Sequence, residues 1–395
     1  MAEAEIDDVL VVTHPLAPAS ESHVAALLDI IGAITSVALV PTNLSEESSI
    51  RDDFEVLEIS REGVGESILV AAVRFVLNQL RMCRTIARRD EDIILFFGAT
   101  SYLLPIAFSR LLGRTVVLEP RGDVPLTLRL QWEQTVPAPI ARALAGAVWV
   151  LEHAGYRAAD AIVTYTPSMA EELELERYEE KLYPNGARYV NTDEFSVETP
   201  FEARENVVGF LGRLDEEKGI RTLAQVAKEL PDDLTFRFIG DGDLRSWLER
   251  ELAEEIDAGT VEITGWVDHE EVPKQLNDLR LLVLFSEPTE GLPTVIMESM
   301  ACGTPVYATP VSGVPDVVRE GETGYVLQDR EPEIIAARIE SILRDESIGD
   351  RSERSTALIR RQYQREAAIG RYRTILAAIT HIEATYADPD DRAPV

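Results

Sequence analysis

The sequence predicts an α/β protein with two domains. The chain of 395 residues is longer than one ordinary hydrophobic core supports. Short apolar runs of strand length alternate with stretches of helical spacing, and polar loops separate them. Residues 281–310 show the pattern, with an apolar run at 281–285, a loop, a helix that ends at Gly303, and a second strand. Strands that alternate with helices in this way are typical of parallel sheets.

In the first half of the chain, strands and helices are expected in turn up to an Asn-Gly turn at Asn185 and Gly186. Ser20 is expected to cap the first helix, because a serine hydroxyl accepts from the unpaired N–H groups of the first turn. The expected strands are residues 9–13, 37–40, 55–59, 93–98, 115–119 and 161–165. The expected helices are residues 20–31, 66–89, 102–112 and 139–158, with a further one starting at Pro167.

The polar segment 200–206 predicts a domain boundary, and the first strand of a second domain follows it at residues 207–211. Strands are also expected at 236–239 and 261–265, with Asp243 capping the helix after the first of them. Residues 331–343 and most of 351–386 are predicted to be helical, and the end of the chain is predicted to fray. The resulting division is 1–200, 201–365, 366–386 and 387–395.

The charge of the chain restricts its partners and its compartment. Asp and Glu number 70 against 38 Lys and Arg, which gives a net charge of −32. Such a surface argues against a nucleic-acid partner and repels itself unless salt screens it, so we expect a halophilic archaeal origin. No apolar run is long enough to span a membrane, and the acidic start is unlike a signal peptide. Cys83 and Cys302 are expected to be small buried hydrophobes in a reduced cytoplasm.

The stretch 286–310 carries the main functional pattern. Gly291, Leu292, Pro293 and Thr294 form a helix entry just past the end of a strand, and the unpaired N–H groups of a helix start favour an anion. Glu290 precedes the helix and Glu298 lies inside it, about 12 Å apart along a helix. Two carboxylates suit hydroxyl groups on either side of phosphates, as in a nucleoside diphosphate sugar. Two solvated carboxylates remain the alternative.

Four blocks in order resemble the retaining glycosyltransferases of family 4. They are SEPTEGLPTVIMESMACGTPVYATP at 286–310, GFLGRLDEEKGI at 209–220, FIGDGDL at 238–244 and SGVPDVVREGETGYVL at 312–327. The resemblance is strong over residues 181–343 and holds only in outline before them. It implies the GT-B fold, with two facing Rossmann-like domains and a C-terminal helix that crosses back onto the first domain.

The resemblance also implies roles for residues of the second domain. Arg213 and Lys218, which follow Gly212, would contact the donor diphosphate, with the amides of Gly291, Leu292, Pro293 and Thr294 helping. Glu298 would hold the ribose hydroxyls and Glu290 the sugar. Trp266 and Val267 match the block whose backbone meets the nucleobase, although Trp266 as a core residue is an equal alternative. Asp241 and Asp243 lie in a glycine-rich turn, so we expect no metal and no cofactor beside a UDP- or GDP-linked donor.

Three residues of the first half are candidates for the acceptor side. Arg121 and Asp123 follow the strand 115–119, and open α/β sheets bind ligands at such ends. His14 follows the first strand, where alanine and proline stand in place of the family's glycines. A plain turn at 121–123 and a loop histidine without a role remain alternatives. The histidine that the family often has on this side is absent.

The helix predicted at 66–89 has a basic face formed by Arg74, Arg81, Arg84 and Arg88. Apolar residues line the adjacent face, namely Val70, Val73, Leu77 and Leu80. Such a helix suits an anionic membrane surface, and an ordinary solvated amphipathic helix is the alternative. The helix suggests a polyprenyl-linked acceptor and a cytoplasmic protein at the inner membrane face.

The sequence therefore predicts a retaining hexosyltransferase that acts on a lipid-linked or cell-surface glycan precursor. The alternatives are a GT-B nucleotide-sugar epimerase, a soluble glucoside synthase and a non-catalytic nucleotide-sugar-binding protein.

Overall fold

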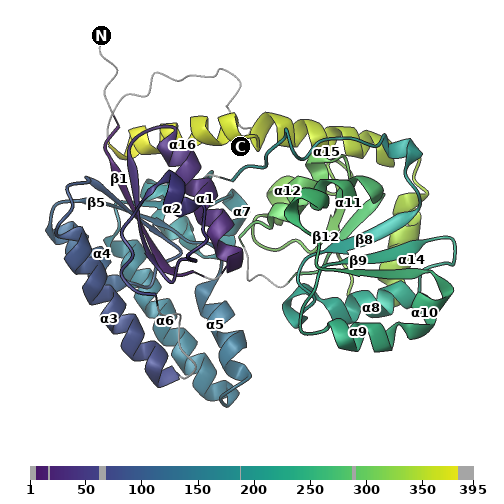
Figure 1. The fold of residues 1–395 in the computed structure, drawn as a ribbon, viewed down its shortest axis with the longest axis horizontal. Helices are drawn as coiled ribbons and strands as arrows, with labels where there is room; N and C mark the ends of the chain where they lie inside the picture. The colour runs from purple at the N-terminus through teal and green to yellow at the C-terminus, as the bar shows by residue number, and fades with distance from the viewer. Residues whose placement is uncertain (1–5, 17, 62–67, 187, 287–290, 381–395) are drawn as a thin grey trace, which may run out of the picture. The chain divides into compact units, whose positions relative to one another are not determined.

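The computed structural model describes residues 6–16, 18–61, 68–186, 188–286 and 291–380, and it divides the chain into two compact units (Figure 1). Unit 1 consists of Met1–Arg188 and Glu366–Val395, and unit 2 consists of Tyr189–Arg365. Each unit has its own parallel β-sheet with helices packed on it, so the α/β fold predicted from the sequence is confirmed.

The sheet of unit 1 has the strand order β3-β2-β1-β4-β5-β6-β7, and every pairing is parallel. Its central strands are continuous apolar runs, as expected for strands covered on both faces. The strands are β1 (Val9–Pro15), β2 (Val37–Thr42), β3 (Glu55–Val56), β4 (Ile93–Phe97), β5 (Thr115–Glu119), β6 (Ala161–Val163) and β7 (Leu182–Tyr183).

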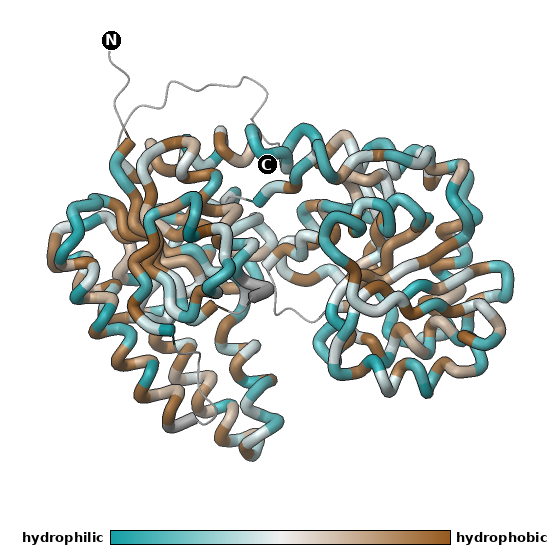
Figure 2. The backbone as a smooth tube through the Cα atoms, viewed as in Figure 1, coloured by the Kyte–Doolittle hydropathy of each residue, from teal (hydrophilic) through white to brown (hydrophobic). Residues whose placement is uncertain are grey.

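Helices of unit 1 bury alternate residues of these strands. On one face, Leu10, Ile94 and Val116 are register neighbours and pack with Met82 and Ile106 from two helices. The helices are α1 (Pro18–Gly32), α2 (Ile50–Asp53), α3 (Ile68–Ile86), α4 (Leu103–Leu111), α5 (Val124–Glu133), α6 (Ala138–Ala158), α7 (Pro167–Glu172), the 3₁₀ helix η1 (Leu175–Lys181) and α16 (Arg365–Ile379). Figure 2 shows the hydrophobic segments concentrated at the sheet.

The returning helix α16 is fixed to unit 1 by a buried hydrogen bond. The Tyr372 hydroxyl donates to Glu119 Oε2 at 2.7 Å, and both residues are fully buried. Arg371 also donates to the Arg188 carbonyl at 3.4 Å. The last helix therefore packs on the first half of the chain, 253 positions away from the strand residue that it contacts.

The sheet of unit 2 has the order β10-β9-β8-β11-β12-β13, again with parallel pairings. Its strands are β8 (Val207–Leu211), β9 (Thr235–Ile239), β10 (Val261–Gly265), β11 (Leu281–Leu284), β12 (Val306–Ala308) and β13 (Tyr325–Val326). Its α-helices are α8 (Ile220–Lys228), α9 (Arg245–Glu251), α10 (Ala253–Ala258), α11 (Val272–Asp278), α12 (Thr294–Ala301), α13 (Val314–Val317), α14 (Pro332–Leu343) and α15 (Ile348–Gln362). Its 3₁₀ helices are η2 (Phe201–Ala203), η3 (Glu216–Lys218) and η4 (His269–Glu271).

Two predicted helix caps were wrong. The first helix begins at Pro18, so Ser20 lies inside it rather than at its cap. The helix after β9 begins at Arg245 with Leu244 at the cap position, so Asp243 lies before the cap. The Leu244 N–H pairs with the Leu214 carbonyl, which fixes the start of α9 one residue later than the sequence suggested.

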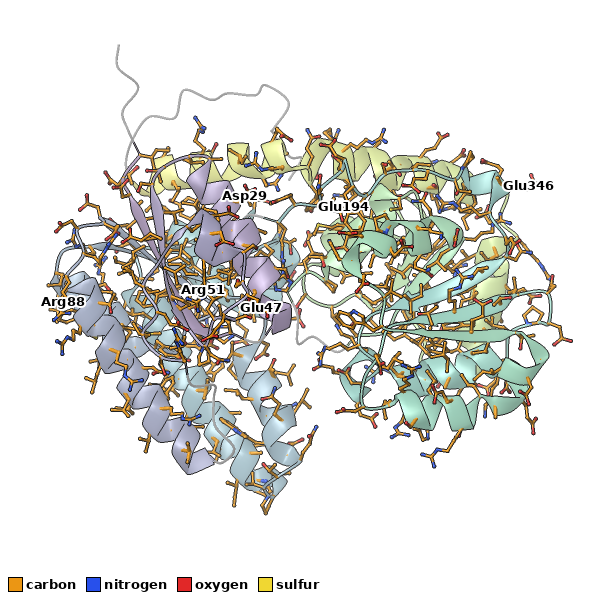
Figure 3. The ribbon with its side chains drawn as sticks, in the orientation of Figure 1. Asp29, Glu47, Arg51, Arg88, Glu194 and Glu346 are labelled. Atoms are coloured by element: carbon orange, nitrogen blue, oxygen red, sulfur yellow. The ribbon has the colours of Figure 1, made fainter. Side chains whose placement is uncertain are left out.

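Residues 189–200, assigned to the first domain from the sequence, are grouped with unit 2. The reason is their hydrogen bonding, because Asn277 Oδ1 accepts from the N–H groups of Glu198 and Thr199. Charged side chains cover both units, among them the labelled Glu47 and Arg51 of unit 1 and Glu346 of unit 2 (Figure 3).

Candidate functional site

The sheet of unit 2 reverses its strand order between β8 and β11. From β8 the chain adds strands on one side through β9 to β10, and from β11 it adds strands on the other side through β12 to β13. Open α/β sheets bind ligands outside the carboxyl ends of the strands at such a point. The segments that follow β8 and β11 hold most of the predicted donor residues. We therefore take this edge of unit 2 as the candidate donor site.

Arg213 lies in the loop that follows β8 and Gly212. Its guanidinium is half-exposed and forms ion pairs with Asp215, at 2.7 Å, and with Glu217. These two carboxylates belong to the same loop, so they hold the arginine side chain in one orientation. The Gly212 N–H donates to the Ile239 carbonyl at 3.0 Å, which ties this loop to the end of β9.

Lys218 is buried, with 7% of its surface exposed, and lies at the end of η3. Gly219 follows it with φ +67°, and a Cβ at this position would stand 2.6 Å from the Phe285 carbonyl oxygen. The loop after β8 therefore contacts the end of β11 backbone to backbone, which a residue with a side chain would prevent. This contact places the backbone of Lys218 next to the end of β11.

We call the place between β8 and β11, where the strand order reverses, the switch point. The start of α12 follows β11, on the other side of the switch point from the Arg213 loop. Gly291, Leu292 and Pro293 are buried, and Pro293 occupies the cap position ahead of Thr294. The Gly291 carbonyl accepts from the Gly313 N–H at 2.7 Å, so the entry is held by the loop after β12. The predicted helix start is confirmed. Glu290 lies outside the described residues.

Glu298 lies in the second turn of α12 and is half-buried. The residues around it in sequence, Met297 and Ser299, are fully buried against unit 2. Its carboxylate therefore projects from the more exposed side of the helix that begins at the switch point. Its contact with ribose hydroxyls stays a prediction.

The ends of β9 and β10 add the remaining residues of this edge. Trp266 follows β10 and is 76% exposed, so its alternative interpretation as a core residue was wrong. Val267 is half-buried beside it. Asp241 pairs with Arg245 at 2.6 Å and accepts from the Gly242 N–H, and this arginine, followed by the backbone hydrogen bond, lowers the pKa of the carboxyl.

In unit 1, His14 and Arg121 lie together at the carboxyl ends of β1 and β5. A Cβ at Gly98, after β4, would stand 3.0 Å from Arg121 Cδ and 3.1 Å from His14 Nδ1. Arg121 also lies over the Phe97 ring at 5.3 Å and donates to Nδ1 of His23. Burial, followed by the nearby Arg121, lowers the pKa of His14 to about 4. The structure thus brings together two of the three acceptor-side candidates.

The third candidate, Asp123, has a structural role. It caps α5 by accepting from the Leu126 N–H at 2.7 Å, and partial burial is the main cause that raises its pKa. Near this end of the sheet, the Thr100 hydroxyl donates to the buried carboxyl of Glu152. Burial raises the pKa of Glu152 to about 7.

Sequence reasoning missed a buried group around Glu119. Burial raises the pKa of Glu119 to about 7, although Tyr372, Arg188 and Arg121 oppose the rise. Arg188 is buried with its guanidinium 4.4 Å from the centre of the Tyr165 ring. These residues come from β5, the loop after β6, the end of the first segment of unit 1 and α16. No local pattern links positions so far apart, so only the fold reveals the group.

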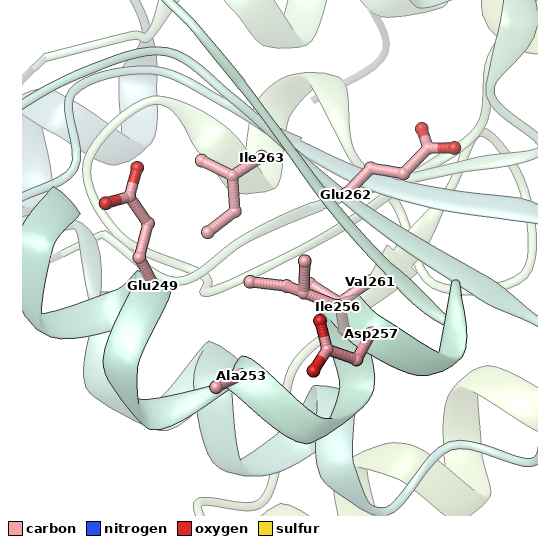
Figure 4. Close-up of a pocket in the computed structure, with 7 residues that line it drawn as sticks. All are labelled: Glu249, Ala253, Ile256, Asp257, Val261, Glu262 and Ile263. Atoms are coloured by element: carbon pink, nitrogen blue, oxygen red, sulfur yellow. The ribbon is translucent and has the colours of Figure 1, made fainter.

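Two surface hollows lie elsewhere. One, of about 580 Å³, lies between α9, α10 and β10 and has the carboxylates of Glu249, Asp257 and Glu262 in its lining (Figure 4). Its acidic lining does not suit a diphosphate. The other, of about 650 Å³, lies on unit 1 beside α6. Among the described residues, no group of three or more His, Cys, Asp or Glu is placed to hold a metal ion.

Comparisons with known proteins agree with this geometry. Residues 191–365 match the family described as glycosyl transferases group 1. The lipopolysaccharide core biosynthesis glycosyltransferase LpsE of Rhizobium meliloti is 31% identical over 229 residues, which is 56% of this chain and 66% of that protein. A Campylobacter jejuni N-acetyl-D-galactosaminyltransferase, whose name includes a PP-undecaprenol-linked saccharide, is 29% identical over 164 residues, 40% of this chain and 43% of that one.

The fold has clear neighbours among solved structures. HepE of Anabaena in complex with UDP superposes with a TM-score of 0.71 over 94% of this chain and all of that one, at 15% identity. The structural neighbours and the two parallel sheets show an α/β two-domain GT-B fold. The sequence matches support a glycosyltransferase family with this fold.

Proposed function

We propose that this chain is a retaining, family 4 glycosyltransferase that moves a hexose from a nucleotide sugar to an acceptor hydroxyl. The observation that carries the proposal is the switch point of unit 2. There, the loop with Arg213 and Lys218 and the start of α12 follow the two strands that flank the reversal. The match of residues 191–365 to group 1 glycosyl transferases supports it, as does UDP bound in a structural neighbour.

The proposed chemistry is charge stabilisation of the leaving group. As the bond between the sugar and the diphosphate breaks, negative charge grows on the diphosphate. Lys218 and Arg213 would neutralise this charge, with the amides at the start of α12. Because these groups already supply positive charge, we propose that transfer needs no metal ion and no cofactor. Glu298 would bind the ribose hydroxyls, and Glu290 would bind the sugar.

The acceptor would bind at the strand ends of unit 1, where His14 and Arg121 lie together. We propose a lipid-linked or cell-surface glycan precursor, and the relative named for a PP-undecaprenol saccharide supports this class. The protein would then work in the cytoplasm, at the inner face of the cell membrane. In the described residues, no helix is long and apolar enough to cross a membrane.

A transfer assay tests the proposal. The protein is incubated with radiolabelled UDP- and GDP-hexoses and a membrane lipid extract, and label is measured in the organic phase. We expect label to enter the lipid with release of the nucleoside diphosphate, and the new linkage to keep the donor's anomeric configuration by NMR.

Other outcomes would point to the alternatives. Conversion of the nucleotide sugar to its epimer without acceptor would indicate an epimerase, and label in a water-soluble glucoside would indicate a soluble synthase. Nucleotide binding without any turnover would indicate a binding protein and would overturn the proposal.

A further inference from the structure

Helix α3 buries one apolar stripe, which includes Met82 and Ile86, and it exposes a second apolar stripe. Its amide residues Asn78 and Gln79 are buried, and Gln79 Oε1 accepts from the Leu104 N–H at 3.0 Å at the start of α4. The side chains of the exposed stripe are aliphatic, with Val73 at 60% and Leu80 at 52% exposure. A helix buries its apolar stripe when nothing else covers it, so this exposed stripe points to a binding surface.

Exposed apolar side chains also lie on two more helices of the same layer. α4 packs against both α3 and α6, and all three cover the same face of the unit 1 sheet. In the described part of unit 1, every exposed large hydrophobic side chain lies on these helices or at Leu112 next to α4. They are Val70, Val73, Val76, Leu77 and Leu80 of α3, Leu104 and Leu111 of α4, and Ile140, Trp149 and Val150 of α6. We call this set, with Leu112, the apolar face.

The charges of the three helices have one sign. Glu152 is the single acidic residue in their sequences, and it is buried. Their basic residues are Arg74, Arg81 and Arg84 of α3, Arg110 of α4, and Arg142 and Arg157 of α6. Arg88 follows α3 and is exposed on unit 1 (Figure 3). Arg110 pairs with Asp160 and Arg142 with Glu133, both from neighbouring segments. In a chain of net charge −32, three helices that carry no exposed carboxylate of their own are a local exception.

The C-terminal half of α6 joins the apolar face to a cationic hollow. Trp149 stacks on His153 at 3.8 Å and lines the hollow of about 650 Å³ together with Arg157, Arg177 and Tyr178. Lys181 lies nearby and donates to the Arg157 carbonyl at 3.1 Å, which adds a third cation beside the two arginines of the hollow. A tryptophan between apolar and charged surface is typical of the boundary between lipid tails and headgroups.

We propose that the apolar face docks on an anionic lipid bilayer, with the aliphatic side chains at the acyl boundary and the arginines at the phosphates. Charge complementarity selects this occupant, because two copies of the face would place arginines against arginines, whereas anionic headgroups attract them. The area spans three helices, so the surface is larger than the single basic helix that the sequence indicated. The inference depends on this surface alone and holds whether or not the transfer reaction does.

Vesicle co-sedimentation of the full chain tests the proposal. Phosphatidylglycerol and phosphatidylcholine vesicles are compared in KCl at a concentration that keeps the protein folded. We expect binding to phosphatidylglycerol vesicles, at least about tenfold weaker for the double variant Leu77→Ser, Leu80→Ser and reduced for Arg81→Gln, Arg84→Gln. Ile334→Ser is the matched control, since Ile334 is 48% exposed on α14 of unit 2, and it should bind like the wild type.

A second readout does not depend on the folding of the serine variants. Brominated phosphatidylglycerol should quench the fluorescence of Trp149, so Trp149→Phe should lose most of the quenching. Trp247→Phe should retain it, because Trp247 lies on α9 of unit 2 under Arg221. Absence of wild-type binding, or equal quenching in the two variants, would overturn the proposal. A lipid-free dimer that Leu77→Ser, Leu80→Ser dissociates would overturn it as well, in favour of self-association.

Discussion

Lys218 combines features that are rare for a lysine in this chain. It is one of four lysines and is buried, next to a glycine that contacts the end of the strand across the switch point. Burying an ammonium group costs free energy unless an anion or dipoles compensate it. Because little water surrounds this ammonium, a diphosphate bound beside it would gain a strong charge interaction. Arg213 lies at the surface instead, where it pairs with two carboxylates of its own loop.

We expect Lys218→Met to weaken binding of the nucleoside diphosphate by about 10- to 150-fold, since a hydrogen bond to a charged group contributes about 1.5–3 kcal/mol. Lys228→Met is the control, because Lys228 pairs with Glu251 at 2.7 Å on the surface of α8. Isothermal titration calorimetry measures both. Equal affinities in the two variants would remove Lys218 from the donor site.

Glu119 makes the stability of unit 1 depend on pH. Its folded-state pKa is raised from 4.5 to about 7, so the folded state keeps a proton that the unfolded state loses in this interval. The free energy of unfolding therefore falls as pH rises from 4.5 to about 7, by on the order of 3 kcal/mol, and stays lower above it. His14 acts oppositely, because its pKa is lowered from 6.5 to about 4 and its contribution grows with pH.

Glu119→Gln isolates the carboxyl from these opposing groups. The amide oxygen still accepts from the Tyr372 hydroxyl, but it does not titrate. We expect the difference in unfolding free energy between variant and wild type to rise in the variant's favour between pH 4.5 and about 7. Urea unfolding across this range measures it. A difference that does not change with pH would show that Glu119 titrates normally in the folded protein.

At the scale of elements, the two loops that flank the switch point depend on one close contact. Gly219 has φ +67°, and any side chain there would meet the Phe285 carbonyl. The contact positions η3, and with it Lys218, at the end of β11. Such a contact requires glycine for two reasons. Glycine adopts a positive φ without strain, and it has no Cβ that would meet the neighbouring backbone.

Gly219→Ala should therefore reduce both stability and nucleotide affinity. Gly259→Ala is the matched control, because Gly259 has φ +80° but no atom within 4 Å of its Cβ position. The control should lose only the cost of the left-handed conformation, about 1–2 kcal/mol, and should bind nucleotide normally. Urea unfolding and calorimetry separate the two effects. Equal losses in the two variants would mean that the contact with Phe285 does not matter.

Sequence patterns predicted the elements well and their ends less well. The strands that precede Gly212 and Gly291, β8 and β11, are short apolar runs without a polar residue. The strand that precedes Trp266, β10, instead alternates buried and exposed residues. The start of a helix depends on which loop carbonyls its first N–H groups can reach. The Leu244 N–H donates to the Leu214 carbonyl, and Leu244 rather than Asp243 therefore occupies the cap position of α9. The burial of Gln79 on α3 also depends on tertiary packing, because its Oε1 accepts from the Leu104 N–H at the start of α4.

The candidate site was predictable only where it follows local motifs. Arg213, Lys218 and the start of α12 each belong to a continuous block that can be read in the sequence. The group around Glu119, Arg188 and Tyr372 assembles from three distant segments, and its chemistry arises from burial. Burial of a carboxylate has no sequence signature, so this group could not be found before the fold.

At the scale of the whole molecule, the net charge of −32 dominates. Like charges spread over both units repel one another, and the folded state holds them closer together than the unfolded state does. Salt shortens the range of this repulsion from about 10 Å at 0.1 M to about 3 Å at 1 M. We propose that the protein is adapted to a cytoplasm rich in salt.

The melting temperature should therefore rise steeply with KCl between about 0.1 M and several molar. Glycerol at matched water activity serves as the control, because it changes hydration without screening charge. Differential scanning calorimetry measures both series. Equal stability at low and high KCl would contradict the proposed adaptation.

The central claim is that unit 2 holds a nucleoside diphosphate sugar at its switch point. A thermal-shift screen with UDP-, GDP- and dTDP-hexoses in molar KCl tests it most directly, because a ligand that binds only the folded state raises the melting temperature. We predict a saturable rise with one nucleotide, lost in Glu298→Gln and kept in the surface control Lys228→Met. No rise with any nucleotide sugar, or an unchanged rise in Glu298→Gln, would contradict the site described above.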